Sequence, residues 1–190
     1  MEEKNKKPLR NKSIRPGDYI VATKWIGIEG ALEIINHKRE ELKKRFSANF
    51  LEYFNDYEAA LSTEKESEYA KAFDVKETVY ANEGGIFKAL GELSAVAGRG
   101  LEVDIYKIPV RQEVIEICNF YDISPYELKS KGMVLMVLTE PEALVDSFMS
   151  EGIKAAVIGK IRDDNDKIII NKEAVRYLDK IKQDSIYKIL

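Results

Sequence analysis

Two glycine-containing segments are the parts of this sequence whose residue types and spacing are best suited to chemistry. They are Gly27, Glu29 and Gly30 in the first segment, and Glu83, Gly84 and Gly85 in the second. Each segment lies where a β-prone run gives way to an amphipathic helical pattern. The first N–H groups of a helix and the helix dipole attract an anion, and glycine lets a phosphate approach the backbone. The six residues therefore form a candidate phosphate-binding site.

The same residues also have a purely structural explanation. Glycine permits tight turns and close packing, and the carboxylate of Glu83 would itself occupy the positive end of the second helix. Neither segment is a Walker loop, because no Gly-Lys-Ser or Gly-Lys-Thr follows. Two such junctions in one domain add some weight to the phosphate interpretation, since ligands of sheet proteins bind where strands give way to helix starts. Spacing alone leaves both interpretations open.

The other reactive side chains lack the neighbours that catalysis requires. His37 is the only histidine and lies in a charged helical stretch, which predicts a surface position. Cys118 is the only cysteine and falls on the apolar face of a helical pattern, so it is expected to be a small buried thiol. The acidic run 163–166 lacks the glycine and the distal glutamate of a calcium loop and is predicted to be a solvated hairpin turn. We therefore expect no catalytic residue and no metal site.

Hydrophobic periodicity predicts the elements that position these residues. Strands are expected at 19–23, 75–81, 101–106, 133–138, 155–158 and 168–170, and helices at 31–45, 63–73, 86–97, 109–121 and 141–151. Ser47 is expected to cap a further helix, and Thr63 with Glu66 fits a capping box. The unbroken apolar run 133–138 predicts a strand buried on both faces at the centre of the sheet. Residues 175–190 fit strand and helix equally. The pattern is that of an α+β domain with a mixed, mostly buried β-sheet covered by helices.

Composition limits the class of protein. The chain has 190 residues, of which 45% are apolar, with 30 basic and 33 acidic side chains. A chain of this size buries a substantial core without disulfides, and no apolar run approaches the roughly 20 residues of a membrane span. Residues 1–13 carry five basic and two acidic groups and are predicted to be a disordered basic tail, and residues 14–190 a single, mildly acidic domain. We expect a cytoplasmic protein without a membrane partner, whose body does not bind nucleic acid.

Six short segments resemble, in the same order, the C-terminal domain of AIR synthase-related (PurM-like) proteins. The segments are Ile14–Val21, Thr23–Gly30, Glu83–Gly85, Lys107–Val110, Asp122–Pro125 and Ala156–Ile161. The resemblance covers residues 14–190 and is greatest to the hydrogenase maturation factor branch of the family, that of the HypE-like carbamoyl dehydratases. It implies the α+β fold of the PurM-like C-terminal domain.

The resemblance also implies a function. Enzymes of this family have two domains: an N-terminal half supplies the acidic metal and nucleotide loop and the dimer barrel, and a C-terminal half adds glycine turns to the phosphate cleft. A chain with only the second half is expected to be a binding or assembly module that is non-catalytic alone. It would bind ATP or another phosphate ligand only with a partner domain. The alternative is half of a split ATP-dependent synthase or hydrogenase maturation enzyme that needs a separate N-terminal ATP-binding subunit.

In either case an apolar face that the N-terminal half covers in the family would be exposed. This predicts a homo-oligomer or a complex with a separate N-terminal-type subunit. A third possibility, from a different class, is an accessory protein whose basic tail binds nucleic acid.

Two departures from the family pattern limit what the resemblance implies. The family commonly reads Asp-x-Thr-x-Gly-Gly before the paired glycines, whereas Tyr80 and Asn82 stand here in place of the Asp and Thr. Polar contacts to a nucleotide or substrate are thereby lost, although the glycine turn remains. The dehydratase branch carries its carbamoyl group on a C-terminal cysteine. This sequence ends in Tyr187–Leu190, and Cys118 is too far upstream to replace that cysteine.

Overall fold

The computed structural model describes residues 13–190, so the predicted basic tail lies, apart from Ser13, outside the described residues. The strands are β1 (Tyr19–Thr23), β2 (Glu77–Tyr80), β3 (Leu101–Asp104), β4 (Val134–Leu138), β5 (Ala155–Ile161), β6 (Lys167–Asn171) and β7 (Ala174–Tyr177). The α-helices are α1 (Ile28–Leu42), α2 (Ala48–Glu52), α3 (Glu64–Ala72), α4 (Gly85–Ala97), α5 (Gln112–Phe120) and α6 (Glu142–Ser150). Short 3-10 helices are η1 (Tyr53–Leu61), η2 (Ile105–Lys107), η3 (Pro125–Glu127) and η4 (Ser185–Lys188).

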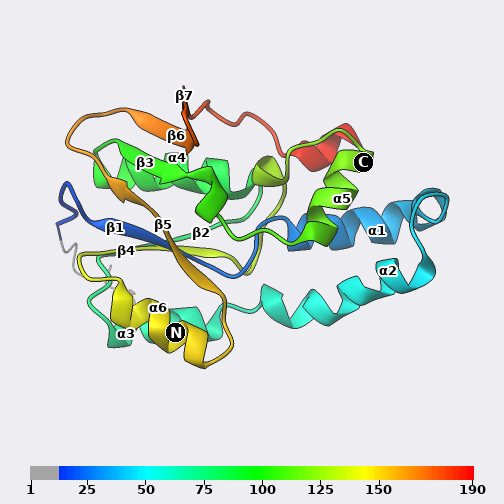
Figure 1. The fold of residues 1–190 in the computed structure, drawn as a ribbon, viewed down its shortest axis with the longest axis horizontal. Coiled ribbons are helices and arrows are strands. Elements are labelled where there is room, and N and C mark those ends of the chain that lie inside the picture. Colours follow the sequence, from blue (N-terminus) through cyan, green and yellow to red (C-terminus); the bar gives the residue numbers. More distant parts are fainter. Residues whose placement is uncertain (1–12) are drawn as a thin grey trace, which may run out of the picture.

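The strands of the described residues form one seven-stranded sheet in the order β2-β4-β1-β5-β3-β6-β7 (Figure 1). Neighbouring strands are antiparallel, except that β3 and β6 are parallel. The mixed α+β architecture expected from the sequence is confirmed. The predicted position of the apolar run 133–138 is wrong in one respect. Every residue of β4 is buried, but the strand lies second from the edge, and β5 occupies the centre.

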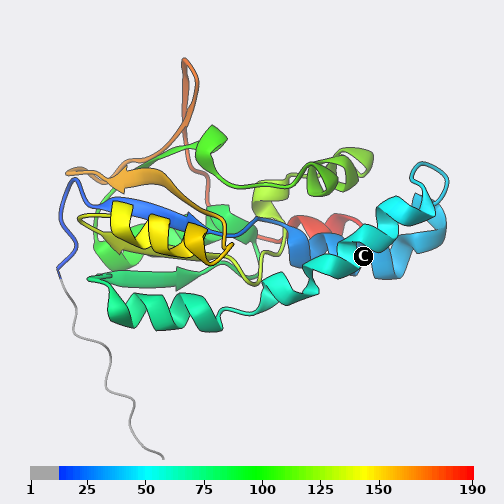
Figure 2. The ribbon, with the colours of Figure 1, turned by 60° about the horizontal axis from the view of Figure 1, so that its bottom comes forward.

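Apolar side chains form three cores around this sheet. On one face α4 contributes Leu90 and Leu93 to a core shared with Leu135 of β4. On the opposite face α6 contributes Phe148 to a core shared with Val21 of β1, and α3 lies beside it. The remaining helices, α1, α2, η1 and α5, build a third core beyond one end of the strands (Figure 1). The β6–β7 hairpin stands out from the body at the top of Figure 2.

Sheet register brings the two glycine turns to the same end of the molecule. β1 and β2 both pair antiparallel with β4, and therefore run in the same direction. Their last residues, Thr23 and Tyr80, are both Cα partners of Val134. Gly27 and Gly84 each follow four residues later and precede α1 and α4. Because β1 and β2 are separated by one strand, about 10 Å of sheet lies between them, and both helices start side by side.

Helix starts follow the sequence prediction in one case and depart from it in another. Ser47 caps α2 as predicted, since its hydroxyl accepts a hydrogen bond from the N–H of Phe50 at 3.2 Å. Thr63 makes no side-chain cap, so the predicted capping box with Glu66 does not form. Glu66 is buried instead, with a carboxylate oxygen 2.8 Å from the ammonium nitrogen of Lys24. A buried carboxylate needs an opposite charge, and Lys24 provides it. Glu66 therefore pairs with Lys24 and does not cap the helix.

The acidic run 163–166 is not a hairpin turn, contrary to the sequence prediction. It joins β5 to β6, and these strands do not pair because β3 lies between them. The N–H of Gly100 donates to the carbonyl of Asp164 at 2.5 Å, and that of Leu101 donates to the carbonyl of Asp166 at 2.9 Å. The run therefore wraps around the start of β3. The ambiguous residues 175–190 contain most of β7, an irregular connection and η4.

The histidine and the cysteine take the positions expected from the sequence. His37 is exposed on α1, and Cys118 is buried on α5. Burial raises the pKa of the Cys118 thiol to about 12, so the thiol stays protonated at neutral pH and is a poor nucleophile. Among the described residues, no helix is both long enough and apolar enough to cross a membrane.

A buried ion pair fixes the start of β1. Asp18 is 3% exposed, and its carboxylate accepts hydrogen bonds from the ammonium of Lys76 at 2.7 and 2.8 Å, from the hydroxyl of Thr139 at 3.0 Å and from the N–H of Arg15 at 2.6 Å. Burial alone would raise the pKa of Asp18, but these hydrogen bonds outweigh it and hold the pKa below its usual value. The cluster ties the turn before β1 to β2 and β4.

Replacing this carboxylate should destabilise the fold in a pH-dependent way. We expect Asp18→Asn to lower the free energy of unfolding by about 3–5 kcal/mol at neutral pH, because Lys76 then stays buried without a counter-charge. The folded-state pKa of Asp18 lies below the ordinary value of 3.8. The carboxylate therefore stabilises the fold fully above that pH and loses this contribution as the pH falls through the folded-state pKa.

Urea unfolding of both proteins at several pH values measures this effect. The difference should be constant above about pH 5 and shrink below about pH 4. Glu151→Gln, which removes the exposed ion pair with Lys65, serves as the control and should leave the unfolding free energy unchanged. A difference between wild type and Asp18→Asn that is the same at acidic and neutral pH would contradict the assignment.

Candidate functional site

The positive end of α4 is already bound to a carboxylate of this chain. Gly84 adopts a left-handed conformation (φ 81°), and its N–H donates to Oδ2 of Asp184 at 2.6 Å. Oδ1 of Asp184 accepts a second hydrogen bond from the N–H of Ile186 at 2.9 Å. Asp184 is only 2% exposed. The sequence pointed to Glu83 as the carboxylate at this helix start, and this is wrong: Glu83 is exposed, and Asp184 takes the position.

At the start of α1 a neutral hydroxyl accepts the hydrogen bond of the backbone N–H. Gly27 is also left-handed (φ 73°), and its N–H donates to Oγ of Ser130 at 2.8 Å. The same hydroxyl donates to the carbonyl of Leu128 at 2.7 Å. The N–H of Gly30 donates to the carbonyl of Lys129 at 3.1 Å. The α1 start is thus bonded to the chain that follows η3.

Glu29 acts on the same segment from the first turn of α1. Its carboxylate oxygen Oε2 accepts a hydrogen bond from the N–H of Lys131 at 3.0 Å. The carbonyl of Asn82 accepts from the N–H of Ser130 at 3.2 Å and from the N–H of Gly85 at 3.1 Å. One carbonyl therefore links the two predicted halves of the site. The structure brings both glycine turns together around residues 125–131.

Close packing explains the glycine at three of these positions. A Cβ on Gly85 would lie 2.5 Å from the carbonyl oxygen of Tyr126 and 2.7 Å from that of Leu128. A Cβ on Gly27 would lie 2.8 Å from a methyl carbon of Val114, and one on Gly30 would overlap the side chain of Leu128. Backbone and core side chains thus occupy the space that glycine leaves. These contacts favour the structural explanation of the motif.

At the start of α1 the nearby basic group is already paired, whereas the side chain of Lys88 lies over Gly84 at the start of α4. Lys129 is the basic residue beside α1, and the carboxylate of Glu33 holds its ammonium at 2.7 Å. The hydrogen bond with Glu33 raises the pKa of Lys129 and keeps it protonated and paired. Three carboxylates, those of Glu29, Glu83 and Asp184, lie in or beside the two turns. The described residues contain no group of three or more His, Cys, Asp or Glu side chains arranged to hold a metal ion.

Sequence reasoning missed Ser130 and Asp184, the two side chains that complete the turns. Ser130 lies 103 residues from its partner Gly27, and Asp184 lies 100 residues from Gly84. The signal available for Asp184 was local: its side chain caps η4 through the N–H of Ile186. A cap motif does not show which distant helix the carboxylate also contacts, so the pairing required the tertiary structure.

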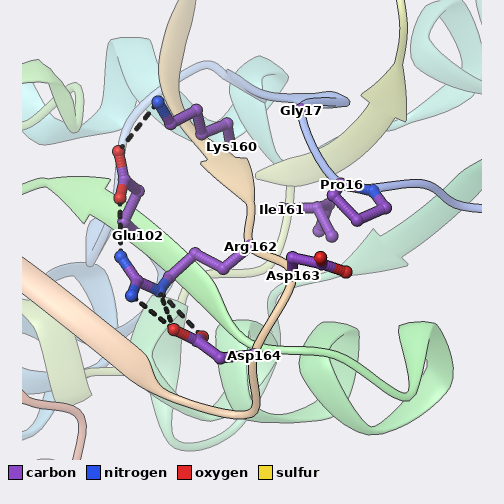
Figure 3. Close-up of a pocket in the computed structure, with 8 residues that line it drawn as sticks. All are labelled: Pro16, Gly17, Glu102, Lys160, Ile161, Arg162, Asp163 and Asp164. Carbon is purple, nitrogen blue, oxygen red and sulfur yellow. Dashed lines mark hydrogen bonds and ion pairs between the residues drawn. The ribbon is translucent and has the colours of Figure 1, made fainter.

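A hollow of about 590 Å³ lies away from the glycine turns (Figure 3). The charged side chains that line it form ion pairs within the chain. Glu102 bridges Lys160 at 3.3 Å and Arg162 at 2.9 Å, and Arg162 also pairs with Asp164. Pro16 and Gly17 from the turn before β1 close the other side. The basic groups that line the hollow already contact carboxylates. These ion pairs therefore form a structural network around the start of β3.

The structure is a mixed α+β domain in which two strand, glycine turn and helix units meet at one end of a single sheet. A family model described as the C-terminal domain of AIR synthase-related proteins matches residues 15–171. The chain belongs to this family, and its similarity is to the HypE-like branch.

Three known proteins illustrate the similarity. The carbamoyl dehydratase HypE of Rhodobacter capsulatus is 25% identical over 151 residues, which cover 77% of this chain and 42% of HypE. A crystal structure of E. coli HypE superposes with a TM-score of 0.75 at 19% identity, over 95% of this chain and 55% of that chain. A HypE structure in complex with ATP has a TM-score of 0.66 at 19% identity, over 93% and 54% of the two chains. The chain thus spans about half the length of these proteins.

Substituting the glycines tests the packing explanation. We expect Gly85→Ala to lower the free energy of unfolding by about 2–4 kcal/mol, because the methyl group meets two carbonyl oxygens and the backbone is left-handed (φ 62°). Gly91→Ala in the same helix is the matched control, since a Cβ there meets nothing within 4 Å. It should raise stability by about 0.5–1 kcal/mol. Thermal and urea unfolding measure both, and equal effects of the two substitutions would contradict the explanation.

Proposed function

We propose that this chain is a binding or assembly module of the AIR synthase and HypE-like family that is non-catalytic alone. Its phosphate cleft, at Gly27, Glu29, Gly30, Glu83, Gly84 and Gly85, is at most vestigial. The observation that carries the proposal is the hydrogen bond from the N–H of Gly84 to the carboxylate of Asp184. The donor that would bind a phosphate oxygen at α4 is engaged within the chain.

Electrostatics supports the same proposal. ATP brings several negative charges, and the enzymes that use it neutralise them with Mg²⁺ held by carboxylates. The carboxylates at this cleft are instead bonded to backbone N–H groups in two cases, Glu29 and Asp184. The relative solved with ATP is about twice as long as the matching region. We therefore propose that ATP or another phosphate ligand binds here only when a partner domain supplies the metal-binding residues.

Titration of Mg-ATP and of ADP into the purified chain tests this. We expect no binding in the micromolar range and no ATP hydrolysis, because the N–H of Gly84 is bonded to Asp184 and Lys129 is paired with Glu33. Isothermal titration calorimetry and a phosphate-release assay give the two readouts. Micromolar binding accompanied by turnover would overturn the proposal.

A partner surface is supported by one row of residues across the sheet. Tyr19, Lys160, Glu102, Ile168 and Tyr177 are successive Cα partners from β1 to β7 and therefore share one face. The α3 and α6 core lies over the other half of that face. Tyr19 and Tyr177 are exposed, the latter by 67%. We propose that this row packs against a second copy of the chain.

Light scattering coupled to size-exclusion chromatography measures that association. We expect a mass above that of the monomer, and Tyr177→Glu should return it to the monomer, because a charge would then be buried in the contact. Met149→Glu, on the exposed side of α6, is the control and should leave the mass unchanged. A wild-type monomer at all concentrations would exclude self-association and leave a separate N-terminal-type subunit as the partner.

The second candidate function is half of a split ATP-dependent enzyme. The observation that favours it is length, because the chain matches 42% of HypE from R. capsulatus. Mixing the chain with the separately produced N-terminal half of such a relative discriminates the two. A gain in ATP hydrolysis over the N-terminal half alone would establish the split enzyme, and no gain would favour the non-catalytic module.

A further inference from the structure

The backbone of β7 forms an open edge of the sheet. The N–H of Leu178 donates to the carbonyl of Lys167, at the start of β6, at 2.8 Å. Successive residues of an antiparallel strand alternate between bonding to the neighbouring strand and pointing away from it. The N–H and C=O groups of Val175 and Tyr177 therefore point away from β6. No strand of the described residues lies beyond β7 to pair with them.

The opposite edge of the sheet, β2, is covered by its own side chains. The N–H of Ala81 bonds to the chain at the start of β4, so the same alternation turns Thr78 and Tyr80 outward. The N–H of Thr78 donates to Oε1 of Glu77 at 2.9 Å. The carbonyl of Tyr80 accepts from the side-chain amide of Asn82 at 3.5 Å. The two edges therefore differ, because β2 bonds outward groups within the chain and β7 leaves them open.

Side chains make the β7 edge both apolar and firmly held. Val175 and Tyr177, on one face, are 63% and 67% exposed. Arg176 points to the other face, where its guanidinium lies 5.4 Å from the ring centre of Phe87 in α4. Leu178, directly after the strand, packs on the α4 core. Natural edge strands are commonly protected by a proline or a bulge, and β7 has neither.

We propose that two copies of this chain pair edge to edge through β7, antiparallel about a two-fold axis. Val175 of one copy then exchanges both backbone hydrogen bonds with Tyr177 of the second copy, and symmetry repeats the exchange. The side chains of Val175 and Tyr177 become neighbours on the exposed face. Such pairs of an aromatic and a β-branched side chain stabilise sheets. The two sheets thereby join into one.

A second copy matches this edge in length and in shape. β7 has four residues, and the turn residues Lys172 and Glu173 precede it. Leu178 follows it and packs on the body, so a longer strand would find no further backbone partners at either end. A second β7 hairpin is equally short and stands out from its own body, which lets the two edges meet (Figure 2). Because β2 is covered, edge pairing by itself joins two copies and no more.

This proposal goes beyond the contact through the row of residues from Tyr19 to Tyr177, because it uses the edge of the sheet and not its face. A contact through the face leaves the outward N–H groups of Val175 and Tyr177 open to solvent. Edge pairing places both groups in hydrogen bonds. The two contacts therefore differ in the exchange rates of two backbone amides.

Hydrogen exchange on the wild type, read amide by amide by NMR below and above the concentration at which the chain associates, tests the pairing. We expect the amides of Val175 and Tyr177 to gain about tenfold or more protection in the associated protein, because both become bonded. The amide of Thr78, on the covered edge, is the internal control and should keep its rate. Unchanged exchange at Val175 and Tyr177 on association would overturn the proposal.

Substitution at position 175 gives a second test. Val175→Pro removes the outward N–H and keeps the ladder between β6 and β7, because that N–H is not part of the ladder. We expect the dimer Kd, measured by sedimentation equilibrium, to rise about tenfold or more, since symmetry removes two hydrogen bonds. Val175→Thr keeps the N–H and the branched shape and should change the Kd by about threefold at most. Urea unfolding checks that both variants fold, and an equal Kd for all three proteins would overturn the proposal.

The edge pairing and the function proposed above fail separately. A dimer that Val175→Pro leaves intact refutes the edge pairing and leaves the contact through the row in place. A wild type that stays monomeric at all concentrations refutes both contacts. Hydrolysis of Mg-ATP by the chain refutes the non-catalytic module and does not bear on the edge pairing.

Discussion

Backbone N–H groups at the start of a helix need acceptors, and the structure around the glycine turns depends on how this chain supplies them. α1 and α4 both begin at the same end of the sheet, where the first N–H groups of each helix face a crowded region. Ser130 supplies the acceptor at the start of α1, and Asp184 supplies it at the start of α4. The carbonyl oxygen of Asn82 links the two helix starts, because it accepts from the N–H groups of both Ser130 and Gly85. The glycines are needed because the bonded segments approach too closely for a Cβ.

The chemical difference between these two acceptors matters for function. The hydroxyl of Ser130 at the start of α1 is neutral and also donates to the carbonyl of Leu128. Its role at that helix start is therefore structural. The carboxylate at α4 is charged and comes from the C-terminal residues, 100 positions further along the chain. The first N–H at the start of α4 is therefore already bonded to a negative charge of the same chain.

The sheet has an equally asymmetric construction. Helices α3 and α6 pack over β2, β4 and β1, whereas the row from Tyr19 to Tyr177 has exposed or half-buried side chains. The salt bridges of Glu102 with Lys160 and Arg162 cross this surface and satisfy its charges (Figure 3). The Asp18 cluster keeps the strands beneath it in register.

The sequence by itself determined the fold class, most strands and helices, and both strand, glycine turn and helix units. It could do so because apolar periodicity and glycine punctuation are local properties of neighbouring residues. Tertiary structure alone decided that β4 lies off-centre, that 163–166 wraps around β3, that Glu66 pairs with Lys24, and that Asp184 rather than Glu83 occupies the α4 start. Each of these depends on partners far apart in the chain. The pairing of a buried donor or charge is fixed by which distant group packing brings to it, and no local pattern carries that information.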